Sequence, residues 1–125
     1  MNTKMELEYT INTSPKVLFP RLSTAGGLSE WFADDVHVNN KIFTFIWERS
    51  EQEAEMLMKK ELQFVRFHWL DDEDPKSYFE FKIHQDDLTR DIALIITDFA
   101  EEEDLESAKE LWDSQVGSLK HLLGL

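Results

Sequence analysis

Histidines and clustered carboxylates are the side chains of this sequence best suited to acid–base chemistry or metal binding. The histidines are His37, His68, His84 and His121. None of them lies in an HxH or HExxH motif, or at ligand spacing from a carboxylate. The acidic run 71–74 lacks the glycine turn and the spaced ligands of a calcium loop. We therefore expect no metal ion, and solvated positions for these side chains.

The carboxylates do not form a recognisable acid–base pair. Such a pair needs one member in an apolar pocket that raises its pKa, and only Asp98 and Asp34 have neighbours that approach this condition. The chain has no cysteine, no serine or threonine in a nucleophile motif, and no glycine-rich phosphate loop, since Gly26 and Gly27 are an isolated pair. The sequence thus predicts no catalytic residue and no cofactor, and favours a binding protein over an enzyme.

Gln115 is the polar side chain with the most informative position. It interrupts a series of apolar residues spaced three and four apart, so its buried amide needs a partner. That partner is a strand side chain, a water molecule or a ligand. Gly117 follows two residues later and disfavours a helix by ~1 kcal/mol relative to alanine. Either the helix packs closely on a strand there, or the missing side chain leaves room for a ligand.

Aromatic and methionine side chains recur on one face of several expected strands. Most of them will form the hydrophobic core. Flat aromatic rings and flexible methionines also suit an adaptable apolar pocket. The candidate ligand-binding residues are Trp31, Trp47, Met56, Met58, Trp69, Phe79, Phe81, Trp112 and Gln115.

Alternating and β-branched segments predict the strands that position these residues. We expect strands at 5–11, 36–38, 42–48, 53–59, 63–70, 78–85 and 90–98. Ser14 as N-cap and Pro15 in the first helical position predict a short helix to about residue 22, and 28–32 predicts another helical turn or two. Ala54, Met56 and Met58 share one face of their strand. His68 and His84 lie on polar strand faces, and a slip of one residue would turn both inward.

The last segment predicts a long helix with one broad apolar face. That face consists of Leu105, Ala108, Leu111, Trp112, Gln115, Val116, Leu119, Leu122 and Leu123. An apolar face this wide must be buried, and the sheet is the only available surface. Short turns between successive strands favour antiparallel pairing.

Composition limits the classes of function. The 125 residues suit one domain, and their net charge of −13 opposes binding to nucleic acid or to an anionic membrane surface. No apolar run approaches the ~18 residues of a membrane span, and no signal peptide is recognisable. The absence of cysteine fits a reducing compartment, so the expected location is the cytoplasm.

Three segments resemble the START-like, or SRPBCC, superfamily and its branch related to the Hsp90 ATPase activator C-terminal domain. They are Leu28-Ser29-Glu30-Trp31-Phe32, then Leu88-Thr89-Arg90 followed by 92–99, and Leu111-Trp112 followed by 117–123. The resemblance covers nearly the whole chain. It implies an α+β helix-grip fold over residues 1–125: a curved antiparallel sheet of six to seven strands around a long C-terminal helix, with two short helices between the first and second strands.

The resemblance also implies a cavity between the long helix and the concave sheet. The preferred interpretation is binding of a small apolar or amphipathic molecule there, without chemistry. The first alternative is a protein-interaction module of the Hsp90-activator type, in which the acidic surface meets a basic partner. The third is an enzyme of the cyclase or hydratase kind. One fold hosts all three roles, so the fold does not decide among them, and the oligomeric state stays open.

Removal of divalent ions should leave the stability of the protein unchanged. Prolonged EDTA treatment is expected not to shift the thermal midpoint, because the sequence offers no set of side chains at ligand spacing. Thermal denaturation before and after treatment checks this. A loss of several degrees that one specific divalent ion restores would contradict our interpretation of the acidic runs.

Overall fold

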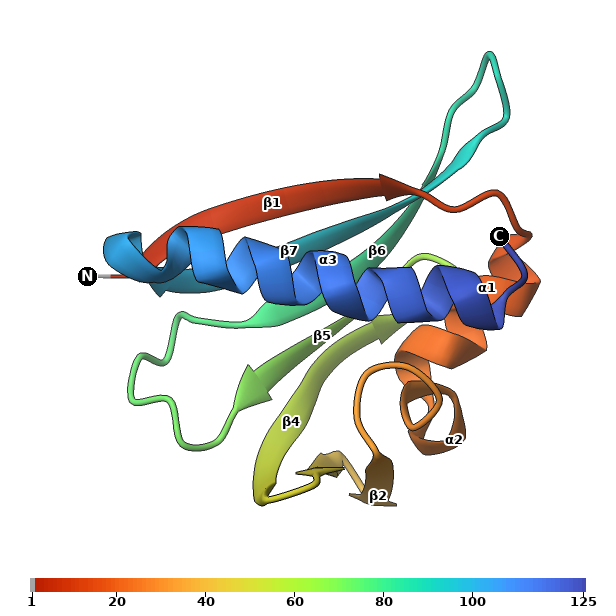
Figure 1. Ribbon diagram of the computed structural model, residues 1–125. Helices are drawn as coiled ribbons and strands as arrows, with labels where there is room; N and C mark the ends of the chain where they lie inside the picture. The colour runs from red at the N-terminus through yellow and green to blue at the C-terminus, as the bar shows by residue number, and fades with distance from the viewer. Residues whose placement is uncertain (1) are drawn as a thin grey trace.

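Two helices separate the first strand from the other six, and one long helix closes the chain (Figure 1). The computed structural model describes residues 2–125. The strands are β1 (Asn2–Thr10), β2 (Asp35–Asn39), β3 (Ile42–Trp47), β4 (Ser50–Lys60), β5 (Phe64–Trp69), β6 (Phe79–Gln85) and β7 (Ile92–Glu101). The helices are α1 (Pro15–Ser23), α2 (Ala25–Leu28), the 3-10 turn η1 (Glu102–Asp104) and α3 (Leu105–Leu122).

All seven strands form one antiparallel sheet in the order β1-β7-β6-β5-β4-β3-β2. The first strand therefore lies beside the last, and α1 and α2 carry the chain from one edge of the sheet to the other. Helix α3 runs across one face of the sheet (Figure 1). The expected α+β helix-grip fold is confirmed, with seven strands and both short helices between β1 and β2.

Strict alternation in the central strands turns one set of side chains into the core under α3. The buried inward residues include Phe43, Phe45, Val65, Phe67, Phe79, Phe81, Leu94 and Ile96. The expected register of the histidine-bearing strands is confirmed, because Phe67 and Ile83, which precede His68 and His84, pack in or against the core. His84 is exposed, and Nδ1 of His68 lies 2.8 Å from the carbonyl oxygen of Ser77 on the outer face.

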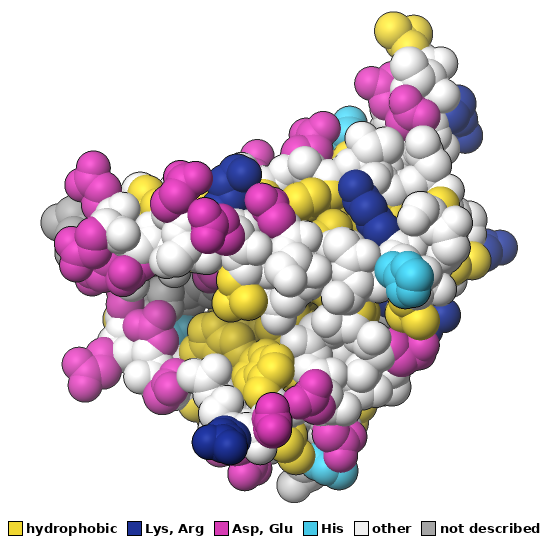
Figure 2. Space-filling view, viewed as in Figure 1, with side chains coloured by type: hydrophobic (Ala, Val, Ile, Leu, Met, Phe, Trp, Pro, Cys, Tyr) yellow, Lys and Arg dark blue, Asp and Glu magenta, His cyan; other side chains and the backbone are white. Residues whose placement is uncertain are grey.

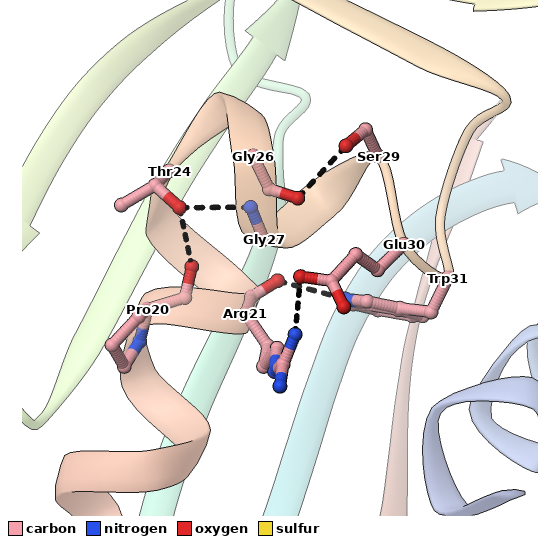
Figure 3. A network of polar contacts seen from close by, with 8 residues as sticks. All are labelled: Pro20, Arg21, Thr24, Gly26, Gly27, Ser29, Glu30 and Trp31. Atoms are coloured by element: carbon pink, nitrogen blue, oxygen red, sulfur yellow. Dashed lines mark hydrogen bonds and ion pairs between the residues drawn. The ribbon is translucent and has the colours of Figure 1, made fainter. Parts of the chain in front are cut away.

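The second short helix was expected at 28–32, after a break over residues 23–27, and this placement is wrong, because α2 spans Ala25–Leu28. Thr24 instead caps α2, because its hydroxyl oxygen accepts a hydrogen bond from the Gly27 amide at 2.9 Å and the hydroxyl donates to the Pro20 carbonyl at 2.8 Å (Figure 3). Gly27 is needed for close packing rather than for a break. A Cβ atom there would lie 2.0 Å from the carbonyl oxygen of Pro20.

Residues 29–32 form turns instead of a helix, and two side-chain contacts hold them against α1 (Figure 3). The indole Nε1 of Trp31 donates to the carbonyl oxygen of Arg21 at 2.7 Å. The guanidinium of Arg21 forms an ion pair with Glu30. These contacts fix the direction in which the chain leaves the helical region, and thereby place Phe32 under α3.

Strand β4 contains a bulge that overturns the expected position of Met58. Met56 pairs with Phe67, and Met58 pairs with Arg66, so Leu57 is an extra residue in β4. One extra residue reverses the faces of all later residues in a strand. Met58 consequently lies on the outer face with 49% of its surface exposed, whereas Met56 packs on the core as expected.

Helix α3 buries only part of the apolar face that the sequence predicts. Trp112, Val116 and Leu119 are buried, but Leu111 is 61% exposed. The reason is the position of the helix, whose sheet contacts are chiefly with β1 and β7. The flank that carries Leu111 therefore faces the opposite half of the sheet without touching it, so our expectation that Leu111 is buried is wrong.

The two neighbouring glycines of α2 provide a matched test of close packing. Gly27→Ala should destabilise the protein by roughly 1–3 kcal/mol or more, because the new methyl group must displace the backbone of Pro20 and Arg21. Gly26→Ala should be neutral or slightly stabilising, because its Cβ meets no atom within 4 Å. Urea denaturation of both variants measures the difference. Equal effects at the two positions would contradict the role assigned to Gly27.

Candidate functional site

An apolar cleft opens between α3 and the half of the sheet that the helix leaves uncovered. Its volume is about 400 Å³. The sheet contributes Trp47, Ser50, Gln52, Trp69 and Asp98, the helix contributes Ala108, Leu111, Trp112 and Gln115, and Phe32 completes the lining. Figure 2 shows an apolar patch beside α3 in this region, with acidic side chains around it. The cleft is thus an opening in the surface of the protein rather than a sealed cavity.

The backbone carbonyl oxygen of Phe32 connects the two sides of the cleft. It accepts hydrogen bonds from the indole Nε1 of Trp47 in β3, at 3.0 Å, and from Nε2 of Gln115 in α3, at 3.1 Å. The sequence predicts that the buried amide of Gln115 needs a partner, and that partner is the backbone carbonyl of Phe32. Within residues 2–125, the Oε1 atom of Gln115 has no hydrogen-bond partner. It remains an acceptor at the lining of the cleft.

Asp98 lies in the lining and is held by two donors. The indole Nε1 of Trp112 donates to one carboxylate oxygen at 2.9 Å, and the backbone amide of Phe99 donates to the other at 2.8 Å. Burial raises the pKa of the Asp98 carboxyl, although both hydrogen bonds act in the opposite direction. The apolar neighbours of Asp98 in the sequence indicated this environment. Asp98 is the only ionisable side chain among the described residues that line the cleft.

Aromatic rings at several inclinations form most of the wall. Phe32 and Trp112 are nearly parallel, with centroids 5.7 Å apart and an interplanar angle of 15°. Trp47 meets Phe32 edge-on at 5.6 Å, and it lies 6.3 Å from Trp69 at 51°. Trp69 in turn stacks on Phe79 with centroids 4.7 Å apart. These contacts support one another, so the ring positions are fixed before any ligand enters.

The structure brings together four of the nine predicted site residues. Trp47, Trp69, Trp112 and Gln115 line the cleft. Of the other five, Phe79 and Phe81 are fully buried beneath it, and Met56 packs against the core. Trp31 lines an adjoining hollow of about 460 Å³ that shares Phe32, Trp47, Leu111 and Gln115 with the cleft. Met58 lies on the outer face of the sheet, for the reason given above.

Several lining residues were absent from the predicted set. Phe32 was part of a motif but was not selected, and its importance lies in its backbone oxygen, which a side-chain pattern does not reveal. Leu111 was assigned to the buried face of the helix. Ser50 and Gln52 lie at the start of β4, before the expected strand begins at 53. An earlier start of that strand would have placed both on the face of Ala54.

Neither a metal centre nor a membrane span is found in the part of the chain that the structure describes. Residues 2–125 contain no group of three or more His, Cys, Asp or Glu side chains able to hold an ion. Over the same residues, no helix combines the length and the apolar character that crossing a bilayer requires.

The fold and the full length of the chain match a known family. The family model described as START-like superfamily domain matches residues 1–125. The chain belongs to the START-like superfamily. Among curated proteins, none matches this chain.

Solved structures show the same architecture as this START-like domain. BfR322 from Bacteroides fragilis is 41% identical, with 99% of this chain and 93% of that chain covered and a TM-score of 0.70. Aha1 from Colwellia psychrerythraea, solved as a dimer, is 16% identical, with coverage of 94% and 93% and a TM-score of 0.77. MLL2253 from Mesorhizobium loti is 17% identical, with coverage of 98% and 97% and a TM-score of 0.79. The latter two are similar in fold.

The raised pKa of Asp98 predicts a specific pH dependence of stability. A carboxyl whose folded pKa exceeds its ordinary value of 3.8 favours the folded state at low pH, and this contribution is lost as pH rises through the folded pKa. The free energy of unfolding of the parent, relative to Asp98→Asn, should therefore fall as pH rises above 3.8. Urea denaturation of both proteins from pH 3.5 to pH 7 measures this difference.

Asp113 supplies a control of opposite sign. The hydroxyl of Tyr9 donates to its carboxylate at 2.6 Å and Lys109 at 3.2 Å, and these bonds lower the pKa of Asp113. Its stabilising contribution is present above 3.8 and is lost as pH falls through the lowered folded pKa. For Asp113→Asn, the free energy of unfolding of the parent relative to the variant should rise with pH. The same rise for Asp98→Asn would contradict the account of Asp98.

Proposed function

We propose that this START-like domain binds one small apolar or amphipathic molecule in the cleft between α3 and strands β3 to β5. The observation that supports this most strongly is the exposure of Leu111 opposite Trp47 and Trp69 across a volume of about 400 Å³. Three large apolar side chains face open space there. Small-molecule sites commonly occupy 300–1,000 Å³ and are lined by such side chains. Ligand binding is also common in the superfamily to which the chain belongs.

Polar atoms in the lining provide a way to orient the molecule. The Oε1 atom of Gln115 accepts hydrogen bonds, and the indole Nε1 of Trp69 donates them, and neither has a partner within residues 2–125. A few polar groups in a mainly apolar wall typically fix the direction in which a ligand binds. An amphipathic molecule with one polar end therefore fits the cleft better than a pure hydrocarbon.

Protein binding is the alternative that the acidic surface keeps open. A net charge of −13 suits a basic partner, as in the Hsp90-activator type of module, and the fold is shared with the Aha1 structure. Salt separates the two functions when the small molecule is uncharged. Binding to a basic protein should weaken sharply as ionic strength rises, whereas binding of an uncharged apolar molecule in the cleft should not.

Enzymatic activity of the cyclase or hydratase kind has less support, because the cleft offers Asp98 without a second ionisable group among the described lining residues.

Leu111→Ala tests the proposed site without disturbing the fold. Because Leu111 is 61% exposed, its truncation should change the free energy of unfolding by less than about 0.5 kcal/mol. It should weaken binding of the neutral fluorescent probe N-phenyl-1-naphthylamine by ~3- to 10-fold, because apolar contact in the cleft is lost. Fluorescence titration measures the affinity, and urea denaturation measures the stability.

Leu122→Ala is the matched control, since Leu122 is also partly exposed on α3 and does not line the cleft. The probe should bind this variant as it binds the parent. If the probe shows no saturable binding to the parent, or if both leucine variants weaken binding equally, the proposed site is wrong.

A further inference from the structure

Among the residues that the structure describes, the carboxylate of Asp98 has hydrogen-bond donors but no cationic partner. Its two bonds come from the indole of Trp112 and from the Phe99 amide, both of which are neutral. Within residues 2–125, no lysine, arginine or histidine forms an ion pair with Asp98. Burial raises the pKa of this carboxyl, because it removes water from the charged form. A positive charge placed in the cleft would compensate the negative charge.

The aromatic rings around the cleft present the surfaces that attract organic cations. The face of an aromatic ring is negative, and a cation within ~6 Å of the centroid is attracted to it, most strongly by tryptophan. Trp47, Trp69 and Trp112 all line the cleft, together with Phe32. Phe32 and Trp112 are nearly parallel and buried, whereas the plane of Trp47 is inclined to Trp69 by 51° and to Phe32 by 71°. The inclined rings of Trp47 and Trp69 suit a rounded ammonium group better than a flat molecule.

The charge of the whole protein acts in the same direction. A net charge of −13 gives a negative potential that attracts cations to the surface and repels anions. Figure 2 shows acidic side chains around the apolar patch beside α3, together with a basic side chain at its lower edge. An arginine and a lysine are next in sequence to lining residues: Arg49 precedes Ser50 in the turn between β3 and β4, and Lys109 follows Ala108 in α3. Neither lines the cleft, so Asp98 is the only charged side chain among the described lining residues.

We propose that the molecule bound in this cleft is an organic cation, with a tertiary or quaternary ammonium group lying among the tryptophan faces, Asp98 as its counter-ion, and an apolar body against Leu111. This inference rests on the proposed function, because it names the ligand class for the same site. It excludes fatty acids and other apolar anions, whose carboxylate would face Asp98. It also gives a reason for a carboxylate without a cationic partner among the described residues of a mainly apolar lining.

Three probes of similar size and different charge test the inference on the full chain. They are 4-phenylbutyltrimethylammonium, 4-phenylbutanol and 5-phenylpentanoate. The parent should bind the cation at least ~10-fold more tightly than the alcohol, and it should bind the anion most weakly. Isothermal titration calorimetry measures all three affinities at one ionic strength.

Two variants and one control assign the preference to the cleft. Asp98→Asn should reduce affinity for the cation by ~10-fold and change affinity for the alcohol by less than ~2-fold, because only the charge is removed. Trp69→Leu keeps the wall apolar but removes a ring face. It should therefore also reduce the affinity for the cation more than the affinity for the alcohol. Asp113→Asn removes an equal charge from the exposed side of α3 and should change neither affinity. Circular dichroism checks that each variant is folded.

The possible results separate the two proposals. Equal affinity of the parent for cation and alcohol, tighter binding of the anion, or an unchanged cation affinity in both Asp98→Asn and Trp69→Leu overturns the cationic ligand while leaving apolar binding in place. Failure of all three probes to bind overturns both proposals. An equal loss of cation affinity in Asp98→Asn and Asp113→Asn shows attraction by the overall field, and it overturns the role of Asp98.

Discussion

The carbonyl oxygen of Phe32 accepts hydrogen bonds from Trp47 and Gln115, and the geometry of the cleft depends on this shared acceptor. It joins a turn, a strand and the closing helix, which are far apart in sequence. The turn is itself held from the other side by the bond from Trp31 to Arg21 and by the packing of Gly27 on Pro20. Phe32 also stacks on Trp112, so one residue positions the sheet wall and the helix wall through its backbone and its ring.

The cleft exists because α3 rests on one half of the sheet. Trp112, Val116 and Leu119 are buried beneath the helix, with Trp112 against Phe32 and Phe81, and this burial stabilises the helix whether or not a ligand is present. The flank with Leu111 is left to face Trp47 and Trp69 across the opening. Trp112 therefore belongs both to the buried face of the helix and to the lining of the cleft, whereas Leu111 belongs only to the lining.

The sequence predicted the fold well because the fold follows from periodicity. Alternation in 43–47, 65–69 and 79–83 turned the correct residues inward, and the spacing of Trp112, Val116 and Leu119 placed the long helix on the sheet. The errors arose where local patterns do not carry the information. The bulge at Leu57 reversed Met58, the contact of Gly27 with Pro20 placed α2 earlier than expected, and the position of α3 along the sheet exposed Leu111. Gln115 was correctly selected as needing a partner, but a backbone acceptor 83 residues away is visible only in three dimensions.

The indole N–H signals of the four tryptophans test ligand binding in this cleft most directly. Trp47, Trp69 and Trp112 line it, whereas the Trp31 indole is bound to the Arg21 carbonyl outside it. In a titration with 4-phenylbutanol followed by ¹⁵N-correlated NMR, we expect saturable shifts of the Trp69, Trp47 and Trp112 signals, with Trp69 changing most because its N–H has no partner within residues 2–125. The Trp31 signal should change least. Absence of saturable shifts in the three cleft tryptophans, or a response confined to Trp31, would contradict the account.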